Sequence, residues 1–181
     1  RYNTDSNKME CYVNNKWMIV STSTPTLDGG ARGVVLGGQE TPGGTKNVIQ
    51  FITISTAGNA TDFGDLTVNT RDNSSAASNT RGLFSGGGSS GTGYVNTIDF
   101  VTIATTGNTT DFGDMTVTGM GVGANSNSIR GVLGGRTNPS KQNVIDFIVI
   151  STTGNAVDFG DLLNVFANCG GTSDSHGGLS E

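Results

Sequence analysis

The chain has very few of the residues from which catalytic and metal sites are commonly built. It contains one histidine, His176, and two cysteines, Cys11 and Cys169, which lie near opposite ends of its 181 residues. A single histidine removes the commonest ingredient of a catalytic triad or a zinc site. Two cysteines so placed form neither a disulfide framework nor a zinc motif, and we expect free thiols rather than a bridge. The sequence therefore predicts no catalytic residue, no metal and no cofactor, and a protein that is not an enzyme.

Positive charge and long apolar runs are also scarce. Ten Lys and Arg stand against 15 Asp and Glu, which gives a net charge of −5. Nucleic-acid binding needs basic residues grouped on one face, so we expect neither nucleic acid nor an anionic membrane as partner. No apolar run is long enough to cross a bilayer, so no membrane insertion is expected. The first residues carry no signal-peptide pattern. The chain starts at Arg1 rather than at a Met, which we interpret as a fragment, a processed product or an incompletely described chain.

Proline and helical periodicity are nearly missing as well. There are three prolines, and no stretch keeps a helical pattern over three turns. Instead, β-branched and aromatic residues form short runs separated by clusters of Gly, Asn and Ser, as is typical of strands and turns. The low charge and the recurring apolar runs distinguish this composition from that of a disordered chain. The sequence predicts an all-β fold.

What the chain does contain is an internal repeat. Three copies begin at Arg32, Arg81 and Arg130, 49 residues apart. Each copy runs through a glycine doublet, a variable loop, an apolar run, a Gly-Asn turn and the sequence Asp-Phe-Gly-Asp. The doublets are Gly37-Gly38, Gly86-Gly87 and Gly134-Gly135. We therefore predict an N-terminal β-hairpin connector over residues 1–24 and a three-repeat domain over residues 25–181, with units 32–80, 81–129 and 130–181.

The apolar run of each repeat is hydrophobic on both faces. In the first copy Ile49 and Phe51 point one way and Val48 and Ile52 the other, because alternate residues of a strand face opposite sides. Strands covered on both faces belong to stacked sheets. The Gly-Asn pairs suit tight turns into a further strand, so each unit is predicted to be an antiparallel sheet of three or four strands. We expect its structural anchors to be Phe51, Phe63, Phe100, Phe112, Phe147 and Phe159.

The glycine doublet, the apolar strand after it and the period near 50 resemble kelch-like repeats. In kelch-like proteins the units are four-stranded blades of a β-propeller, and the resemblance covers residues 32–181. Kelch units usually place a Tyr and a Trp after the doublet, whereas these units have Phe51 and Phe63 at broadly corresponding places. The resemblance implies propeller-blade-like or prism-like sheets. The sequence motifs Arg-Gly-Val, Gly-Gly and Asp-Phe-Gly-Asp-Leu are also similar to repeats in proteins of marine phages.

The first twenty residues resemble an element that recurs in phage tail-fibre proteins, often beside a trimeric receptor-binding region. The similarity rests on Arg1-Tyr2-Asn3-Thr4, on Asn7-Lys8, and on Tyr12 and Trp17. Turn sequences at residues 4–7 and 14–15 predict three short strands, and residues 21–28 suit a linker. The resemblance implies a structural or adhesive protein of a virion appendage such as a tail fibre, with a virion or extracellular location, a role in host attachment and other virion proteins as partners. Alternatives are a secreted cellular filament or adhesin subunit and a glycan-degrading appendage.

Three repeats also predict self-association. An open stack leaves apolar faces and sheet edges in water, and propellers close with about four to eight blades. Residues 175–179 resemble the opening of a fourth unit. We expect a homo-oligomer, with a trimer favoured over a dimer because a threefold axis suits a fibre.

The variable loops, residues 39–46, 88–95 and 136–142, are where the repeats differ most. Rigid scaffolds commonly present binding residues on their connections. The loop residues able to stack on a sugar or to pair with an anionic glycan are Lys46, Tyr94, Arg136 and Lys141, which makes a host-surface glycan a candidate partner. Solvated loop residues without a ligand are an equal alternative.

The repeated Asp-Phe-Gly-Asp sequence has two interpretations. Its aspartates could cap turn amides, or a pair such as Asp62 and Asp65 could bind Ca²⁺ through its carboxylates. The spacing of known calcium loops is missing, so we assign these aspartates to turns and expect no metal.

Overall fold

The computed structural model describes residues 1–4, 8–19 and 32–173. Within these ranges all helical or extended structure is β-strand, and every strand pair is antiparallel. The predicted all-β class is thereby confirmed. The expected domain boundary at residue 24, the linker, His176 and the strand expected at residues 175–179 lie outside the described residues.

The N-terminal residues form a small three-stranded sheet of β1 (Tyr2–Asn3), β2 (Lys8–Val13) and β3 (Lys16–Ile19). Asn14 and Asn15 make the turn between β2 and β3 with φ values of 47° and 63°. Two positive φ angles suit a two-residue hairpin turn, and Asn tolerates them better than most residues. A single uncovered sheet of this size has marginal stability, so its side-chain contacts matter for its persistence.

Glu10 makes this small sheet sensitive to acid. A hydrogen bond from Asn3 and the charge of Arg1 hold the pKa of Glu10 below its usual value of 4.5. A lowered pKa means that the carboxylate stabilises the folded sheet above about pH 4.5 and that this contribution is lost as pH falls through the folded pKa. The guanidinium of Arg1 lies 4.0 Å from the ring centroid of Trp17.

We therefore expect the fluorescence of Trp17, the only tryptophan, to change in an acid titration below about pH 4.5. The variant Glu10→Gln lacks the titrating group and should show no such transition. A wild-type signal that stays constant down to pH 2 would contradict the contribution of Glu10.

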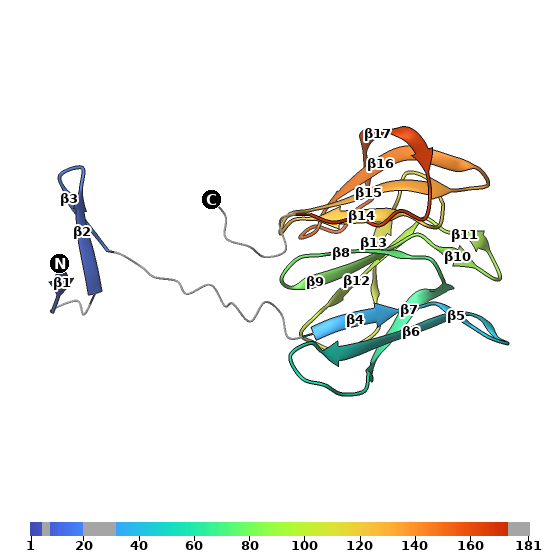
Figure 1. The fold of residues 1–181 in the computed structure, drawn as a ribbon, viewed down its shortest axis with the longest axis horizontal. Helices are drawn as coiled ribbons and strands as arrows, with labels where there is room; N and C mark the ends of the chain where they lie inside the picture. Colours follow the sequence, from blue (N-terminus) through green and yellow to red (C-terminus); the bar gives the residue numbers. More distant parts are fainter. Residues whose placement is uncertain (5–7, 20–31, 174–181) are drawn as a thin grey trace.

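Residues 32–173 form three larger sheets that lie side by side (Figure 1). Sheet 1 contains β4 (Arg32–Leu36), β6 (Gly44–Thr53) and β7 (Thr61–Thr70), with the short β5 (Gln39–Glu40) paired to β6. Sheet 2 contains β8 (Ser74–Ala77), β9 (Arg81–Ser85), β12 (Thr97–Thr102) and β13 (Thr110–Asp114). Sheet 3 contains β14 (Gly123–Ser126), β15 (Arg130–Thr137), β16 (Lys141–Val149) and β17 (Val157–Phe166). The hairpin of β10 (Gly88–Ser89) and β11 (Gly93–Tyr94) extends from sheet 2.

In sheets 2 and 3 the four strands are hydrogen-bonded in chain order, as in an antiparallel meander. Each of these sheets begins one strand before the arginine with which the sequence unit begins. Sheet 2 spans residues 74–114 and sheet 3 spans residues 123–166, rather than following the limits 81–129 and 130–181. A periodic sequence has no marked starting point, and hydrogen bonding to β9 and β15 assigns the short strands β8 and β14 to the sheets that follow them.

One turn position has a left-handed backbone in all three sheets. Gly37, Gly86 and Gly135 have φ values of 57°, 63° and 67°, which disfavours any residue with a Cβ atom. The next residue is Gly38 in sheet 1 and Gly87 in sheet 2, but Arg136 in sheet 3. In backbone conformation, Gly135 and Arg136 are therefore the counterparts of the glycine doublets of sheets 1 and 2. The assignment of Gly134-Gly135 as the third doublet is wrong by one residue.

The hydrophobic core lies between the sheets. One buried cluster joins sheet 1 to sheet 2 and contains Ile49, Phe63, Leu66, Phe84 and Val101. The other joins sheet 2 to sheet 3 and contains Leu83, Ile98, Phe112, Met115, Val122, Leu133, Ile148, Ile150 and Ala156. Sheet 2 is thus covered on both faces, which accounts for the apolar residues on both sides of β12.

Candidate functional site

The Asp-Phe-Gly-Asp strand of one sheet holds the Gly-Asn turn of the next. The amide of Gly107 donates to the carbonyl oxygen of Phe63 at 2.7 Å, and the amide of Thr109 donates to that of Asp65 at 2.8 Å. The amide of Asp65 in turn donates to the side-chain oxygen of Asn108 at 3.0 Å. The backbone of the motif therefore forms a hydrogen-bonded seam between sheets 1 and 2.

The same seam joins sheets 2 and 3. Gly154 donates to Phe112 at 2.7 Å and Ala156 donates to Asp114 at 2.8 Å, while the amide of Asp114 donates to Asn155 at 3.0 Å. Glycine is required in the middle of the motif because the strands approach closely. A Cβ atom on Gly64 would lie 2.3 Å from the carbonyl oxygen of Gly107, and one on Gly113 would lie 2.5 Å from Gly154.

Two buried aspartates add side-chain hydrogen bonds between neighbouring sheets. Asp99 on β12 accepts hydrogen bonds from the amide and the hydroxyl of Thr67 in sheet 1, at 3.0 Å and 2.8 Å. Asp146 on β16 accepts the equivalent pair from Thr116, two residues after the end of β13. In each case the carboxylate is desolvated but receives donors from the neighbouring sheet, as a buried charge requires. The sequence showed these aspartates as polar intrusions in apolar runs, but their partners are distant in the chain.

Arg136, expected to be available to a ligand, is fully buried. Its guanidinium lies 2.8 Å from the carboxylate of Asp146, and both side chains are 0% exposed. It also donates to the carbonyl oxygen of Val117 at 2.8 Å. Arg136 occupies the position of the second glycine of the doublet, and its side chain turns inward, so it stabilises the interior instead of facing a glycan.

The three variable loops lie along one edge of the stack, where β5, β10 and β11 are visible at the right of Figure 1. Thr45 and Ser90 join the first two loops through hydrogen bonds between their hydroxyls and amides at 3.2–3.3 Å. The second loop pairs with the segment that follows β7, through an isolated bridge between Arg71 and Gly88. The third loop pairs with the segment that follows β13, through a bridge between Met120 and Thr137. The edge is therefore a continuous, cross-linked surface rather than three independent loops.

An open groove of about 450 Å³ lies between the first two loops. Its lining carries hydroxyl, amide and backbone groups from Thr45, Thr67, Asn69, Ser89 and Ser90, together with three glycines and a valine. Such a lining offers both hydrogen-bond donors and acceptors without a net charge, which suits a neutral polar ligand such as a sugar. No charged side chain is among the lining residues.

The other expected ligand residues do not gather in this groove. Lys46 forms an ion pair with Glu40 at 2.7 Å across the first loop, and this contact lowers the pKa of Glu40. Tyr94 is half-buried on β11, and Lys141 is exposed at the start of β16. The hydroxyl residues of the groove were missed because Ser and Thr are abundant throughout the chain, so no local pattern distinguishes them.

The repeat phenylalanines have unequal environments. Phe63 and Phe112 are 2% and 3% exposed, whereas Phe159 is 54% exposed and is not the buried anchor that the repeat predicted. Phe51, Phe100 and Phe147 are half-buried, and each meets the motif phenylalanine of its own sheet with ring centroids 6.0 Å apart. Phe159 differs because sheet 3 has no further sheet against this face in the described part of the chain.

The motif aspartates have no arrangement that indicates a metal. Among residues 1–4, 8–19 and 32–173, no group of three or more His, Cys, Asp or Glu side chains is placed to bind one. Asp111 and Asp158 instead accept from the amides of Gly113 and Gly160 at 3.1 Å, at the bulges within β13 and β17. Cys11 and Cys169 are free thiols.

We therefore expect chelation to leave the fold unchanged. Adding EDTA should move the thermal midpoint by less than about 1 °C, because the hydrogen bonds of the seams join groups of the chain itself. Circular dichroism melts with and without added Ca²⁺ provide the measurement. A drop of several degrees on chelation would show that the paired carboxylates bind a metal.

Comparison with known proteins gives this chain no family. No model of a known protein family matches it, and a search of curated proteins finds no match. The part of the chain that the structure describes contains no helix long and apolar enough to cross a membrane.

Proposed function

We propose that this chain is a non-enzymatic structural and adhesive protein of a virion appendage such as a tail fibre. The sheet stack is its architectural body, and the loop edge contacts the host surface. The observation that carries the proposal is the use of the repeated motif: Asp-Phe-Gly-Asp, Asp99 and Asp146 hold one sheet to the next. The chemically conspicuous side chains thus have structural partners, while the open groove presents neutral hydrogen-bonding groups.

We also propose that the three sheets are copies of one unit, arranged like the blades of a kelch-like propeller or the sheets of a prism. Equivalent contacts recur at the repeat interval. Arg32 donates to the carbonyl oxygen of Ile103 at 3.0 Å, and Arg81 donates to that of Ile150 at 2.9 Å. Each of these arginines also lies 4.7 Å from the ring centroid of Phe51 or Phe100 in its own sheet. The repetition of whole contact sets, rather than of single residues, supports one unit used three times.

The attachment role assigns the groove to a host-surface glycan. The test combines mass spectrometry of purified virions with binding of the protein to host polysaccharide. We expect the chain among the virion proteins, and weaker glycan binding when Ser90→Asp introduces a charge into the groove. The matched change Ser128→Asp, outside the groove lining, should leave binding unchanged.

Two results would replace this proposal. If the polysaccharide is shortened during incubation, the chain is a glycan-degrading enzyme, which would need two carboxyl groups about 5–9.5 Å apart across a groove. If the chain is absent from virions and is found on cells, it is a secreted filament or adhesin subunit.

A further inference from the structure

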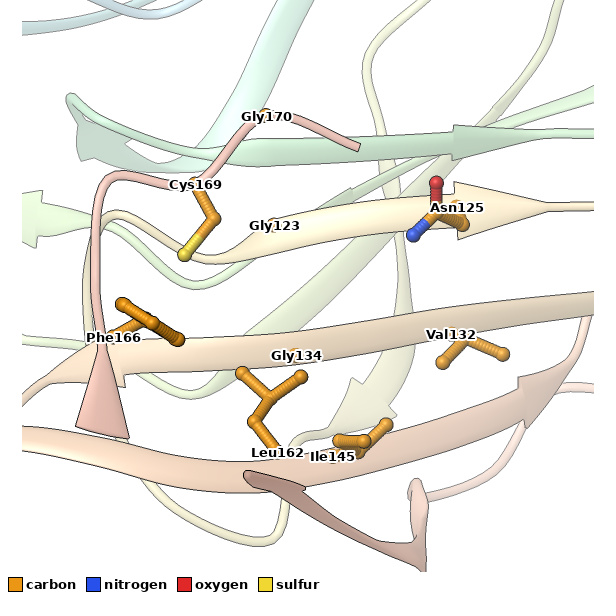
Figure 2. A pocket seen from close by; sticks show the side chains of 9 residues that line it. All are labelled: Gly123, Asn125, Val132, Gly134, Ile145, Leu162, Phe166, Cys169 and Gly170. Carbon is orange, nitrogen blue, oxygen red and sulfur yellow. The ribbon is translucent and has the colours of Figure 1, made fainter. Parts of the chain in front are cut away.

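On the outer face of sheet 3 lie the counterparts of residues that are buried between the sheets elsewhere in the stack. Phe159 and Leu162 on β17 correspond to Phe112 and Met115, which are 3% and 2% exposed. Here Phe159 is 54% exposed. A mostly apolar hollow of about 280 Å³ runs across this face, and Figure 2 shows its lining side chains from all four strands. Its apolar side chains are those of Val132, Ile145, Leu162 and Phe166.

The outer face of sheet 1 is the complementary half of the same contact. Val35, Ile52 and Ile54 are 61%, 39% and 65% exposed. Their counterparts in sheet 3, namely Leu133, Ile148 and Ile150, are 1%, 3% and 1% exposed because they pack on sheet 2. In the part of the chain that the structure describes, the two ends of the stack therefore present without a partner the two surfaces that meet at both internal contacts.

We infer that a second copy of this chain docks head to tail, with its sheet 1 against the sheet 3 of the first. The occupant is set by continuity with the internal contacts, since each open face matches the other end of this chain. The inference rests on the repeat architecture proposed above and not on the attachment role. It names the interaction surface of the oligomer and the contacts that form it.

The hydrogen-bonding groups of the seam are open at both ends. A Cβ atom on Gly160 would meet nothing within 4 Å, unlike one on Gly64 or Gly113, so the edge of the third motif is free to receive a turn. At the other end Gly58 and Asn59 form the first Gly-Asn turn. The amides of Gly107 and Thr109 donate to the preceding sheet, whereas among the described residues no such backbone hydrogen bond comes from Gly58 or Ala60. In the docked pair this turn donates its amides to Phe159 and Asp161, and Asn59 accepts from Asp161.

The repeat arginine of sheet 3 differs from its two counterparts in its contacts. Arg130 corresponds to Arg32 and Arg81, and it lies 5.2 Å from the ring centroid of Phe147. Its side chain is exposed, whereas the other two donate to a carbonyl of the next sheet. In the docked pair its partner is the carbonyl oxygen of Ile54 in the second copy.

Residues 168–173 continue the path of β8 and β14 beyond sheet 3. Asp72, Gly121 and Asn168 all have left-handed φ values, of 56°, 67° and 58°. Gly121 donates to the carbonyl oxygen of Asp72 at 3.0 Å, and Asn168 donates to that of Gly121 at 2.7 Å. The segment after Asn168 therefore begins in the same way as β8 and β14, and it lies next to β14 as β14 lies next to β8.

A serine ladder extends this path. The hydroxyl of Ser126 donates to the carbonyl oxygen of Ala77 at 2.9 Å, and that of Ser173 donates to Ser126 at 2.7 Å. In the docked pair, residues 170–173 of one copy therefore lie beside β4 of the second copy, on the path that β8 and β14 follow.

Two such contacts close a ring. A head-to-tail contact must either close or continue into a filament. Two copies bring together six sheets, within the range of about four to eight at which propellers close, whereas three copies bring nine. The contact therefore favours a dimer, although the fibre-like N-terminal element had favoured a trimer.

One pair at the new contact differs from the internal ones. Gln50 takes the position of Asp99, and Leu163 takes that of Thr67 and Thr116. Leu163 is 101% exposed, so replacing it changes no contact inside the chain. At this junction Gln50 and Leu163 thus replace the hydrogen-bonded Asp and Thr of the internal contacts. Substitutions at these two positions can therefore change the association of two copies without changing the internal contacts.

The test is the mass of the full chain by light scattering at micromolar concentration. We expect about twice 18.5 kDa for the wild type. Leu163→Asp should give a monomer with an unchanged circular dichroism spectrum. The control is Ile129→Asp: Ile129 is 61% exposed, but its counterpart Thr80 is exposed even in the fully covered sheet 2, so the dimer should persist.

A rescue pair tests the head-to-tail register. Gln50→Asp alone should weaken the dimer at least tenfold by placing a carboxylate against Leu163. The double variant Gln50→Asp with Leu163→Thr recreates the internal Asp–Thr pair and should restore the dimer. A monomeric wild type, or an oligomer of any size that Leu163→Asp leaves intact, would overturn the proposal. A trimer dissolved by Leu163→Asp would overturn the ring of two copies.

Discussion

Replacing Phe112 by alanine is expected to lower the free energy of unfolding by about 3–5 kcal/mol. The ring is 3% exposed and belongs to the cluster between sheets 2 and 3, so its loss leaves a cavity that the neighbouring strands cannot fill. That change is a large fraction of the total stability of a domain, which is typically about 5–15 kcal/mol. Denaturant unfolding followed by circular dichroism is the appropriate measurement, because Trp17 reports only on the N-terminal sheet.

The matched control is the same substitution at Phe159, in the same motif but 54% exposed. Measured in a Leu163→Asp background, Phe159→Ala should change the free energy of unfolding by less than about 1 kcal/mol. Equal losses at the two positions would mean that Phe159 is buried in the monomer. A loss near zero at Phe112 would remove the cluster between sheets 2 and 3 as the main source of stability.

Replacing Asp146 by asparagine should cost about 3–5 kcal/mol. The substitution leaves the guanidinium of Arg136 buried without its counter-charge, and a broken buried ion pair is more costly than an ion pair that was never present. Thr116 can still bond to the asparagine, so the loss reports mainly on the charge. Urea unfolding of the variant gives the value.

Two further variants separate charge from packing. Asp99→Asn removes an equivalent carboxylate that bonds to Thr67 and Thr109 and has no cation, and it should cost only about 1–3 kcal/mol. Adding Arg136→Met to Asp146→Asn removes the orphaned charge and should recover part of the loss. If the double variant is less stable than Asp146→Asn alone, Arg136 stabilises the sheet by packing rather than through its charge.

The strand pattern could be predicted from the sequence because it depends on local rules. Period-two alternation in residues such as Ile49 and Phe51 identified strands with two apolar faces, and Gly-Asn pairs identified turns. The short strands β8 and β14 could not be assigned in the same way. Their residues are Ser, Ala, Gly and Asn, without a β-branched or aromatic side chain, and only hydrogen bonding to β9 and β15 places them in a sheet.

The candidate site was less predictable because its contacts join distant residues. Arg136 looked like a loop residue, since nothing near it in sequence reveals that Asp146 faces it across a bulge. Phe159 looked like its buried relatives, since the repeat does not encode which copy stands at an end. The groove at Thr45 and Ser90 arises where two loops 45 residues apart meet, and neither loop alone has a binding pattern.

The seam between the sheets also bears on how such a chain could change in length. Sheet 2 carries one half of the contact on one face and the other half, including the Asp–Thr pair, on the opposite face, so a second copy of sheet 2 could follow it. A duplicated repeat placed between sheets 2 and 3 would find both of its partners already present, and the contacts elsewhere would remain as they are. Gene duplication in steps of one repeat could therefore alter the number of sheets without any compensating substitution.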